Sequence, residues 1–238
     1  MKAALIIIGN EILSGRTQDQ NLSYLANWLN EIGIQLSEVR VIRDEEEVIV
    51  NTVNYLRENY DYLFTTGGIG PTHDDITSLS IAKAFDVELE VNDKALSILK
   101  EYYKDSELTD ARMKMTMIPK GAELVENPVS KAPGFKMQNV FVMAGIPSIM
   151  QGMLEGAKKH LKGGGIIKSA SIDIFTPESN IAEELAELQN NYPNVEIGSY
   201  PFSKERRFGT SLVLRSEDEL LLKQCELDLL KIVEKYKH

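Results

Sequence analysis

Residues 62–77 read YLFTTGGIGPTHDDIT, and this stretch decides the fold. Its first five residues, Tyr62–Thr66, predict a buried strand that stops at two glycines. A helix is predicted to follow from about Asp75 to Phe85. A glycine-rich connection between a strand and a helix is typical of an α/β protein.

The chemistry of this loop indicates a phosphate site. Glycines let backbone N–H groups approach an anion closely, and the start of the next helix adds a favourable dipole. The loop lacks the Gly-Lys-Ser/Thr of a Walker A motif, and it is not a G-x-G-x-x-G fingerprint. The residues expected to bind the phosphate part of a nucleotide-like or pterin-like ligand are Gly67, Gly68, Gly70, Pro71, Thr72 and Asp74. The alternative is a tight turn in which Thr72 and Asp74 are helix caps.

Two adjacent acids, Asp74 and Asp75, close the loop. Bare carboxylates would repel a phosphate, so their presence suggests a bridging divalent cation such as Mg²⁺. His73 lies between the glycines and these acids, and a role as a hydrogen-bonding loop residue is favoured over one as a general base.

The segments around the loop alternate between strand and helix. Strands are predicted at 3–8, 34–42 and 62–66, and helices lie between them with apolar residues at helical spacing. The order β-α-β-α-β-α with short connections predicts a parallel sheet with helices on both faces. In such sheets ligands bind beyond the carboxyl ends of the strands.

Further polar residues follow the other predicted strands. Glu11 could bind a metal ion or activate water, or it could be a loop acid in solvent. Asp44 follows the strand 34–42 and could equally cap the next helix. Gly145 and Pro147 follow a strand at 140–143 and are expected at the same edge.

Residues 162–165 read KGGG and mark the best domain boundary, because three glycines in a row have no role inside a helix. We expect an α/β domain over 1–165 and a small α+β domain over 166–238. In the second, strands are predicted at 167–175, 194–200 and 208–215, and helices at 178–190 and 217–236.

Composition excludes several classes of protein. The net charge is −10 over 238 residues, and the densest basic cluster, 204–207, is short and contains an acid, so nucleic acid is not an expected partner. No apolar run approaches the roughly 18 residues that a membrane span needs, and no signal peptide is visible. The single cysteine, Cys225, lies in an apolar helical pattern and is expected to be a buried thiol, which fits the cytoplasm.

Together these motifs resemble one family. Residues 67–77, GGIGPTHDDIT, resemble the signature of the MogA-like molybdopterin-binding domain superfamily. Residues 8–21, IGNEILSGRTQDQN, resemble the amino-terminal domain of the competence-damage protein CinA, and are still closer to the amino-terminal domain of eukaryotic FAD synthase. The resemblance implies a three-layer α/β/α fold with a mostly parallel sheet and a small C-terminal α+β subdomain.

The resemblance also implies roles and two activities. Asp75 and Asp44 match acids of molybdopterin-handling relatives, and the glycines match their phosphate-cradling turn. One implied activity is metal-dependent hydrolysis of a nucleotide pyrophosphate such as ADP-ribose or FAD, with Asp75, Glu11 and Asp44 as catalytic residues. The alternative is a molybdopterin- or nucleotide-binding module without hydrolysis, linked to molybdenum cofactor biosynthesis.

For the metal the resemblance implies Mg²⁺, Mn²⁺ or Co²⁺, held by Asp75, Asp44 and residue 10. The CinA branch usually has Gly-Asp-Glu where this chain has Gly9-Asn10-Glu11, and an amide is a weaker ligand than a carboxylate. Relatives self-associate, so a homodimer or trimer is expected. The amidohydrolase domain of full-length CinA and the adenylyltransferase domain of FAD synthase have no expected counterpart in these residues.

Overall fold

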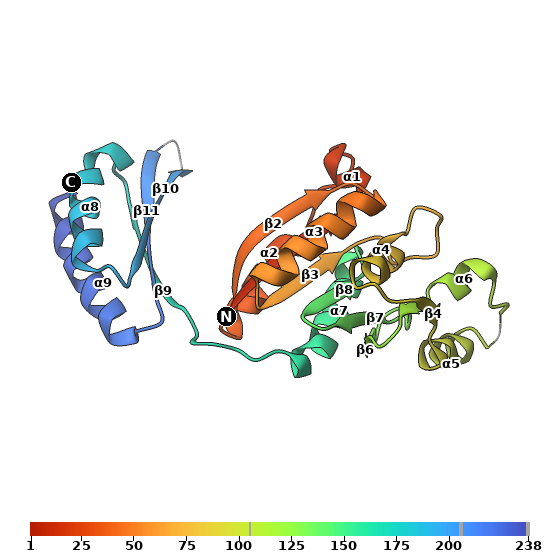
Figure 1. The fold of residues 1–238 in the computed structure, drawn as a ribbon. Coiled ribbons are helices and arrows are strands. Elements are labelled where there is room, and N and C mark those ends of the chain that lie inside the picture. The colour runs from red at the N-terminus through yellow and green to blue at the C-terminus, as the bar shows by residue number, and fades with distance from the viewer. Residues whose placement is uncertain (105, 205–206, 237–238) are drawn as a thin grey trace. The chain divides into compact units, whose positions relative to one another are not determined.

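The fold is described from a computed structural model that covers residues 1–104, 106–204 and 207–236. Residues 205 and 206 of the basic cluster noted above therefore lie outside the described residues. The chain divides into two compact units, Met1–Gly164 and Gly165–His238 (Figure 1). The boundary between them along the chain lies within the KGGG segment, residues 162–165.

The N-terminal unit alternates strands and helices through most of its length. Its elements are β1 (Lys2–Ile8), α1 (Asn10–Leu13), α2 (Asn21–Glu31), β2 (Gln35–Ile42), α3 (Glu46–Asn59), β3 (Tyr62–Thr66), α4 (Thr77–Ala84), β4 (Leu89–Val91), α5 (Asp93–Tyr102), α6 (Asp110–Lys114), β5 (Met117–Pro119), β6 (Glu123–Val125), β7 (Gly134–Met137), β8 (Val140–Met143) and α7 (Pro147–Ala157). A 3₁₀ turn, Lys158–His160, follows α7.

Six strands form the central sheet of this unit, in the order β2-β1-β3-β8-β7-β6. The pairs β2–β1, β1–β3 and β3–β8 are parallel, whereas β7 runs antiparallel to both of its neighbours. The prediction of a mostly parallel sheet is confirmed. Strands β7 and β6, which the prediction did not include, extend the sheet through antiparallel pairs.

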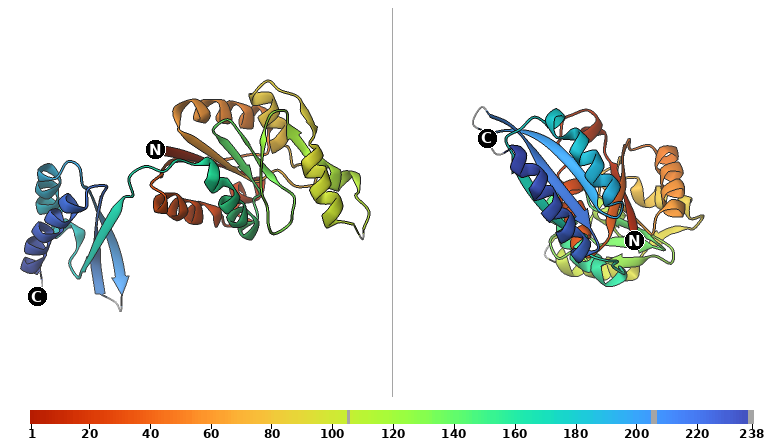
Figure 2. Two further views of the ribbon diagram at one scale, coloured as in Figure 1. Left: turned by 90° about the horizontal axis from the view of Figure 1, so that it is seen from below. Right: turned by 90° about the vertical axis from the view of Figure 1, so that its left-hand side faces the viewer.

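Helices cover both faces of the sheet, as a parallel sheet requires (Figure 2). Apolar residues of α2 and α7 pack with Phe64 and Phe141 on one face. Those of α3 and α4 pack with Leu63 and Val142 on the other. Neighbouring residues of β3 and β8 therefore pack into two separate cores, which is why β8 is apolar throughout and β3 is buried from Leu63 to Thr66. The three-layer α/β/α prediction is confirmed.

The C-terminal unit is built around a three-stranded antiparallel sheet in the order β10-β11-β9. Its elements are β9 (Lys168–Ile174), α8 (Ala182–Asn191), β10 (Glu196–Lys204), β11 (Arg207–Ser216) and α9 (Glu219–Val233), with 3₁₀ turns at Glu178–Asn180 and Glu234–Tyr236. Its core includes Leu212, Leu229 and Cys225. Burial raises the pKa of the Cys225 thiol to about 11, which agrees with a structural rather than a reactive cysteine.

Several predicted boundaries are wrong near the loops. The helix after the glycine loop begins at Thr77 instead of Asp75, because Asp75 turns its carboxylate back into the loop. A short helix, α1, occupies 10–13 directly after the first strand, where no helix is predicted. The short strand β7, Gly134–Met137, has no counterpart among the predicted strands. None of the helices in the described ranges is long and apolar enough to cross a membrane.

Candidate functional site

The glycine loop leaves β3 in a conformation that only glycine adopts easily. Gly67 and Gly68 have φ angles of 101° and 68°, in the left-handed region. A methyl group on Gly67 would lie 2.2 Å from the carbonyl oxygen of Ile8, and one on Gly68 would lie 2.1 Å from Oγ1 of Thr77. Thr77 is fully buried, and its hydroxyl and N–H donate to the carbonyls of Gly67 and Gly68, both at 2.9 Å. The start of α4 therefore holds both loop carbonyls.

Three successive N–H groups of the loop have no partner among the described residues. The N–H groups of Gly68, Ile69 and Gly70 donate no hydrogen bond to any described residue. Successive free amides next to a helix start are an arrangement that binds anions.

The acids of the loop are held by Thr72. The N–H of Thr72 donates to Oδ2 of Asp75 at 2.7 Å, and its hydroxyl lies 2.5 Å from the same oxygen and 2.6 Å from Oδ1 of Asp74. A hydroxyl has one proton, so it donates to one carboxylate at a time. This hydrogen bond lowers the pKa of Asp74 below its usual value, and the charges of His73 and Lys114 add to the shift. The capping prediction is wrong for Thr72 and Asp74, because α4 begins after Ile76 with no side-chain cap.

A second strand-end loop lies against the first. A methyl group on Gly145, which follows β8, would lie 3.2 Å from the Cα atom of Gly67. The carbonyl of Gly145 accepts a 2.7 Å hydrogen bond from Nδ2 of Asn21, which is 3% exposed. The N–H groups of Gly145 and Ile146 donate to no described residue, and Pro147 begins α7 immediately after them. Two sets of free amides, each next to a helix N-terminus, thus meet at one point of the sheet edge.

The two remaining predicted acids come from the ends of β1 and β2. Oδ2 of Asp44 accepts the N–H of Asn10 at 2.8 Å, so Asp44 caps the short helix α1 and not α3, whose N-cap is Glu45. The Glu11 carboxylate folds over Gly9, where a methyl group would lie 2.5 Å from Oε1 of Glu11.

These loops line one cavity of about 650 Å³. Every predicted site residue except Asn10 lines it: Glu11, Asp44, Gly67, Gly68, Gly70, Pro71, Thr72, Asp74, Asp75, Gly145 and Pro147. Its remaining wall is mostly apolar and includes Ile69, Ile146, Ile149, Met153, Met115 and Tyr103. A cavity of this size that combines free amides with apolar side chains suits a ligand with a phosphate and a ring.

Residues 4–162 match the family model described as a probable molybdopterin binding domain. The chain belongs to this family. Residues 167–237 match a second model, the middle domain of FAD synthase. The two matches correspond to the two compact units.

Archaeal relatives are identical to this chain at about one third of the aligned positions. A protein of Archaeoglobus fulgidus is 33% identical over 201 residues, which cover 84% of this chain and 86% of that protein. A protein of Pyrococcus abyssi is 32% identical over 239 residues, which cover 94% of each chain. The solved structure of CinA from Thermoplasma acidophilum, described as a protein of unknown function, has a TM-score of 0.63 at 33% identity, and the match covers 68% of this chain and 99% of that one.

The acids of the cavity fit a cation that is shared with a ligand. Among the described residues, no three His, Cys, Asp or Glu side chains are grouped closely enough to hold a metal ion by themselves. Mg²⁺ is commonly bound by one or two carboxylates together with substrate phosphates. Asp75 and Asp44 each use one carboxylate oxygen within the protein, and both line the cavity beside the free amides.

Sequence reasoning missed four residues that shape this site: Thr77, Asn21, Tyr103 and Met115. Thr77 and Asn21 end the two motifs quoted above, so their position was a usable signal. Tyr103 and Met115 reach the cavity from the α5–α6 excursion, which lies outside the alternating pattern, and nothing in the sequence placed them there.

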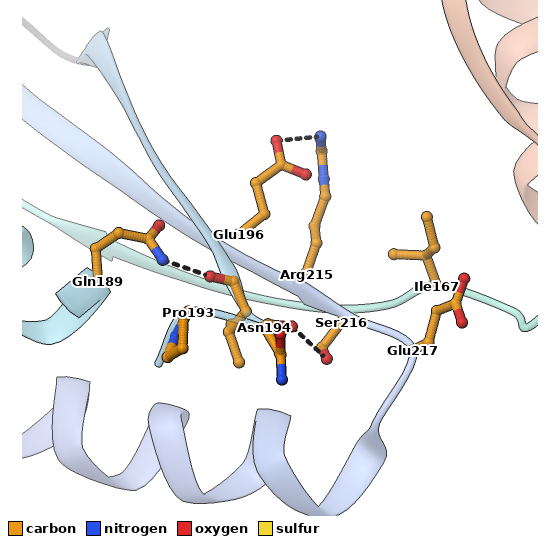
Figure 3. Close-up of a pocket in the computed structure, with 9 residues that line it drawn as sticks. Ile167, Gln189, Pro193, Asn194, Glu196, Arg215, Ser216 and Glu217 are labelled. Carbon is orange, nitrogen blue, oxygen red and sulfur yellow. Dashed lines mark hydrogen bonds and ion pairs between the residues drawn. The ribbon is translucent and has the colours of Figure 1, made fainter. Parts of the chain in front are cut away.

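The C-terminal unit has a separate surface hollow of about 360 Å³ (Figure 3). Its polar groups pair with one another: Nε2 of Gln189 donates to the carbonyl of Val195 at 2.8 Å, and Oγ of Ser216 donates to the carbonyl of Asn194 at 3.0 Å. Glu196 and Arg215 form an ion pair across its rim at 3.7 Å. The candidate functional site is the 650 Å³ cavity of the N-terminal unit, because the strand-end loops with free amides line it.

Proposed function

We propose that the N-terminal unit catalyses metal-dependent hydrolysis of a nucleotide pyrophosphate such as ADP-ribose or FAD. The observation that carries this proposal is the contact between the Gly67 and Gly145 loops. Each loop offers free amides, so one site has room for two neighbouring phosphates. The family description supports a phosphorylated heterocyclic ligand, and the match to a FAD synthase domain favours including FAD among the substrates tested.

In the proposed reaction the amides of Gly68, Ile69 and Gly70 hold one phosphate and stabilise the charge that develops on it. Water attacks that phosphorus, the bridging P–O bond breaks, and the second phosphate leaves with that oxygen. Glu11, which lines the cavity, would accept the proton of the water. The products are AMP and ribose 5-phosphate from ADP-ribose, or AMP and FMN from FAD.

A divalent cation would be held by Asp75 together with Asp44 or Glu11 and by the phosphates of the substrate. When bound, it would offset the repulsion between carboxylates and phosphates and lower the pKa of a coordinated water. Asp75 is oriented for this role by the N–H of Thr72.

The test is AMP release by the purified protein from ADP-ribose and from FAD, with EDTA, Mg²⁺, Mn²⁺ or Co²⁺. We expect AMP only with a cation, at a rate well above that of the EDTA control. No AMP with any cation, from protein whose circular dichroism shows it to be folded, would contradict hydrolysis.

One observation favours the second candidate, a molybdopterin- or nucleotide-binding module without turnover. Asn10 occupies the position where the CinA branch usually has an acid. Among the described residues, Asn10 is not one of those that line the cavity. Binding of ADP or a pterin phosphate in calorimetry without any product in the assay above would favour this candidate.

A further inference from the structure

The lining of the cavity includes one aromatic ring, that of Tyr103, which the proposed chemistry does not use. Tyr103 directly follows α5 and lines the cavity together with Met115, which follows α6. The two helices follow β4 and precede β5, and these two strands form a small sheet separate from the central one. This segment, α5 to α6, thus adds a half-buried tyrosine to a cavity otherwise lined mainly by the loops at the sheet edge.

The Tyr103 ring is held in place by a fixed cation. The guanidinium carbon of Arg112 lies 3.9 Å from the ring centroid. Nη1 of Arg112 donates to the carbonyl of Glu107 at 2.6 Å and to Oγ of Ser106 at 3.1 Å. The ring of Tyr102 also packs against that of Tyr103, with the two centroids 4.9 Å apart and the planes at 73°. These contacts restrict the rotation of the Tyr103 ring, which lowers the entropy lost when a ligand stacks on it.

The same excursion is attached to the phosphate loop. Nζ of Lys114, the last residue of α6, donates to the carbonyl of Thr72. Met115 follows directly and lines the cavity. The tyrosine ring and the free amides of Gly68–Gly70 therefore line the same cavity, and Lys114 connects the segments that carry them.

We propose that Tyr103 is the stacking platform for the heterocycle of the ligand and that it selects compounds in which an aromatic ring is joined to a diphosphate. The proposal rests on the phosphate-binding part of the proposed function and does not require hydrolysis. A cavity of about 650 Å³ is large enough for a ring and two phosphates together. Stacking accepts any flat heterocycle, because every base has a π-face, so the platform would favour rings as a class over ring-free diphosphates.

The experiment compares two ligands that cannot be hydrolysed and that differ only in the nucleoside. The ligands are α,β-methylene-ADP and methylenediphosphonate, and their dissociation constants are measured by calorimetry with Mg²⁺. The variants are Tyr103→Leu and Tyr103→Phe. Tyr55→Leu is the matched control, because Tyr55 is 52% exposed, has the guanidinium of Arg40 4.6 Å from its ring centroid and does not line this cavity.

We expect Tyr103→Leu to raise the dissociation constant of α,β-methylene-ADP by roughly 10- to 100-fold. The dissociation constant of methylenediphosphonate should stay within about twofold of the wild-type value. Tyr103→Phe should keep wild-type affinity for both ligands, since a phenyl ring stacks as well as a phenol. Tyr55→Leu should keep it too, because Tyr55 lies outside the cavity. Equal loss of both ligands in Tyr103→Leu would overturn the platform, because it would indicate a structural role. An unchanged affinity for both would overturn it as well.

The wild-type protein provides a measurement that does not depend on the folding of any variant. It should bind α,β-methylene-ADP more tightly than methylenediphosphonate, and equal affinities would overturn the platform. If methylenediphosphonate binds and AMP is never released from ADP-ribose, the hydrolytic function fails and the platform stands. If neither diphosphate binds, the phosphate cradle and the platform are both overturned.

Discussion

The backbones of Gly67 and Gly145 are in direct contact, although 77 residues separate these glycines along the chain. A methyl group on Gly145 would lie 3.2 Å from the Cα atom and 3.6 Å from the nitrogen of Gly67. The N–H of Gly67 also donates to the carbonyl of Met143, which extends the pairing of β3 with β8 by one residue. This contact places the two sets of free amides next to each other and so defines the polar end of the cavity.

Replacing Gly67 by alanine should remove ligand binding. The substitution combines an unfavourable φ of 101° with a methyl group 2.2 Å from the backbone carbonyl of Ile8, so the loop has to move. We expect no measurable binding of α,β-methylene-ADP in calorimetry, and a loss of unfolding free energy greater than about 2 kcal/mol in urea titrations.

Gly121→Ala is the control for this substitution. Gly121 also has a positive φ, 85°, but a methyl group there meets no atom within 4 Å. It should cost about 1 kcal/mol from backbone conformation alone and leave binding unchanged. Equal effects of the two substitutions on binding would show that the Ile8 contact does not shape the loop.

Asp75→Asn should reduce turnover by roughly 100-fold if this acid holds the cation. An asparagine oxygen can still accept the N–H of Thr72, so the loop geometry is retained while the charge is lost. The measurement is AMP release from ADP-ribose over a range of Mg²⁺ concentrations, with Asp93→Asn as a control outside the cavity. Unchanged turnover at saturating and at limiting Mg²⁺ would remove Asp75 from the mechanism.

The fold could be predicted from sequence because its determinants are local. Short apolar runs such as Tyr62–Thr66, glycines that end them and helices at regular spacing specify a parallel sheet without knowledge of tertiary contacts. The sheet edge follows from that topology, which is why residues as distant as Glu11 and Gly145 could be assigned to one site.

The parts that sequence did not predict depend on tertiary contacts. Asp44 looks like a cap for the helix that follows it, and only the three-dimensional structure shows that its carboxylate reaches the N–H of Asn10. Tyr103 is one of nine tyrosines, and nothing in its neighbours distinguishes it from Tyr102. Arg112 and Lys114 fix its place through contacts that no periodicity reveals.

Asn21→Asp should weaken both stability and ligand binding. The Asn21 side chain is buried, donates to the carbonyl of Gly145 and has an Oδ1 atom with no partner among the described residues. Aspartate has nearly the same shape but no donor, so it would place a carboxylate against a carbonyl and displace the Gly145 loop. We expect a loss of about 2–3 kcal/mol in unfolding free energy and weaker binding of methylenediphosphonate.

Asn27→Asp is the matched control, because it makes the same change of charge at an exposed position of the same helix. It should change stability by less than about 0.5 kcal/mol. If Asn21→Asp lowers stability but leaves diphosphate affinity unchanged, the Gly145 loop does not contribute to phosphate binding.

The last prediction concerns pH and His160, which follows α7. Its side chain is 16% exposed, and Nε2 is buried without a partner in the described chain. Burial lowers the pKa of His160 below its usual value of about 6.5; Lys136 and Lys159 act in the same direction, and Glu123 opposes them. As the pH falls, the unfolded chain therefore takes up this proton before the folded chain does. The contribution of neutral His160 to stability is fully present above about pH 6.5 and is lost as the pH falls from there toward the folded pKa.

His160→Phe should remove this loss, because the replacement packs beside Phe141 and does not titrate. The measurement is the free energy of unfolding in urea at pH 7.5, 6.5 and 5.5 for the wild type and the variant. The wild type should lose more stability than His160→Phe between pH 6.5 and 5.5. Parallel pH curves for the wild type and His160→Phe would mean that the ion pair with Glu123, at 3.5 Å, offsets the cost of burying the charged ring.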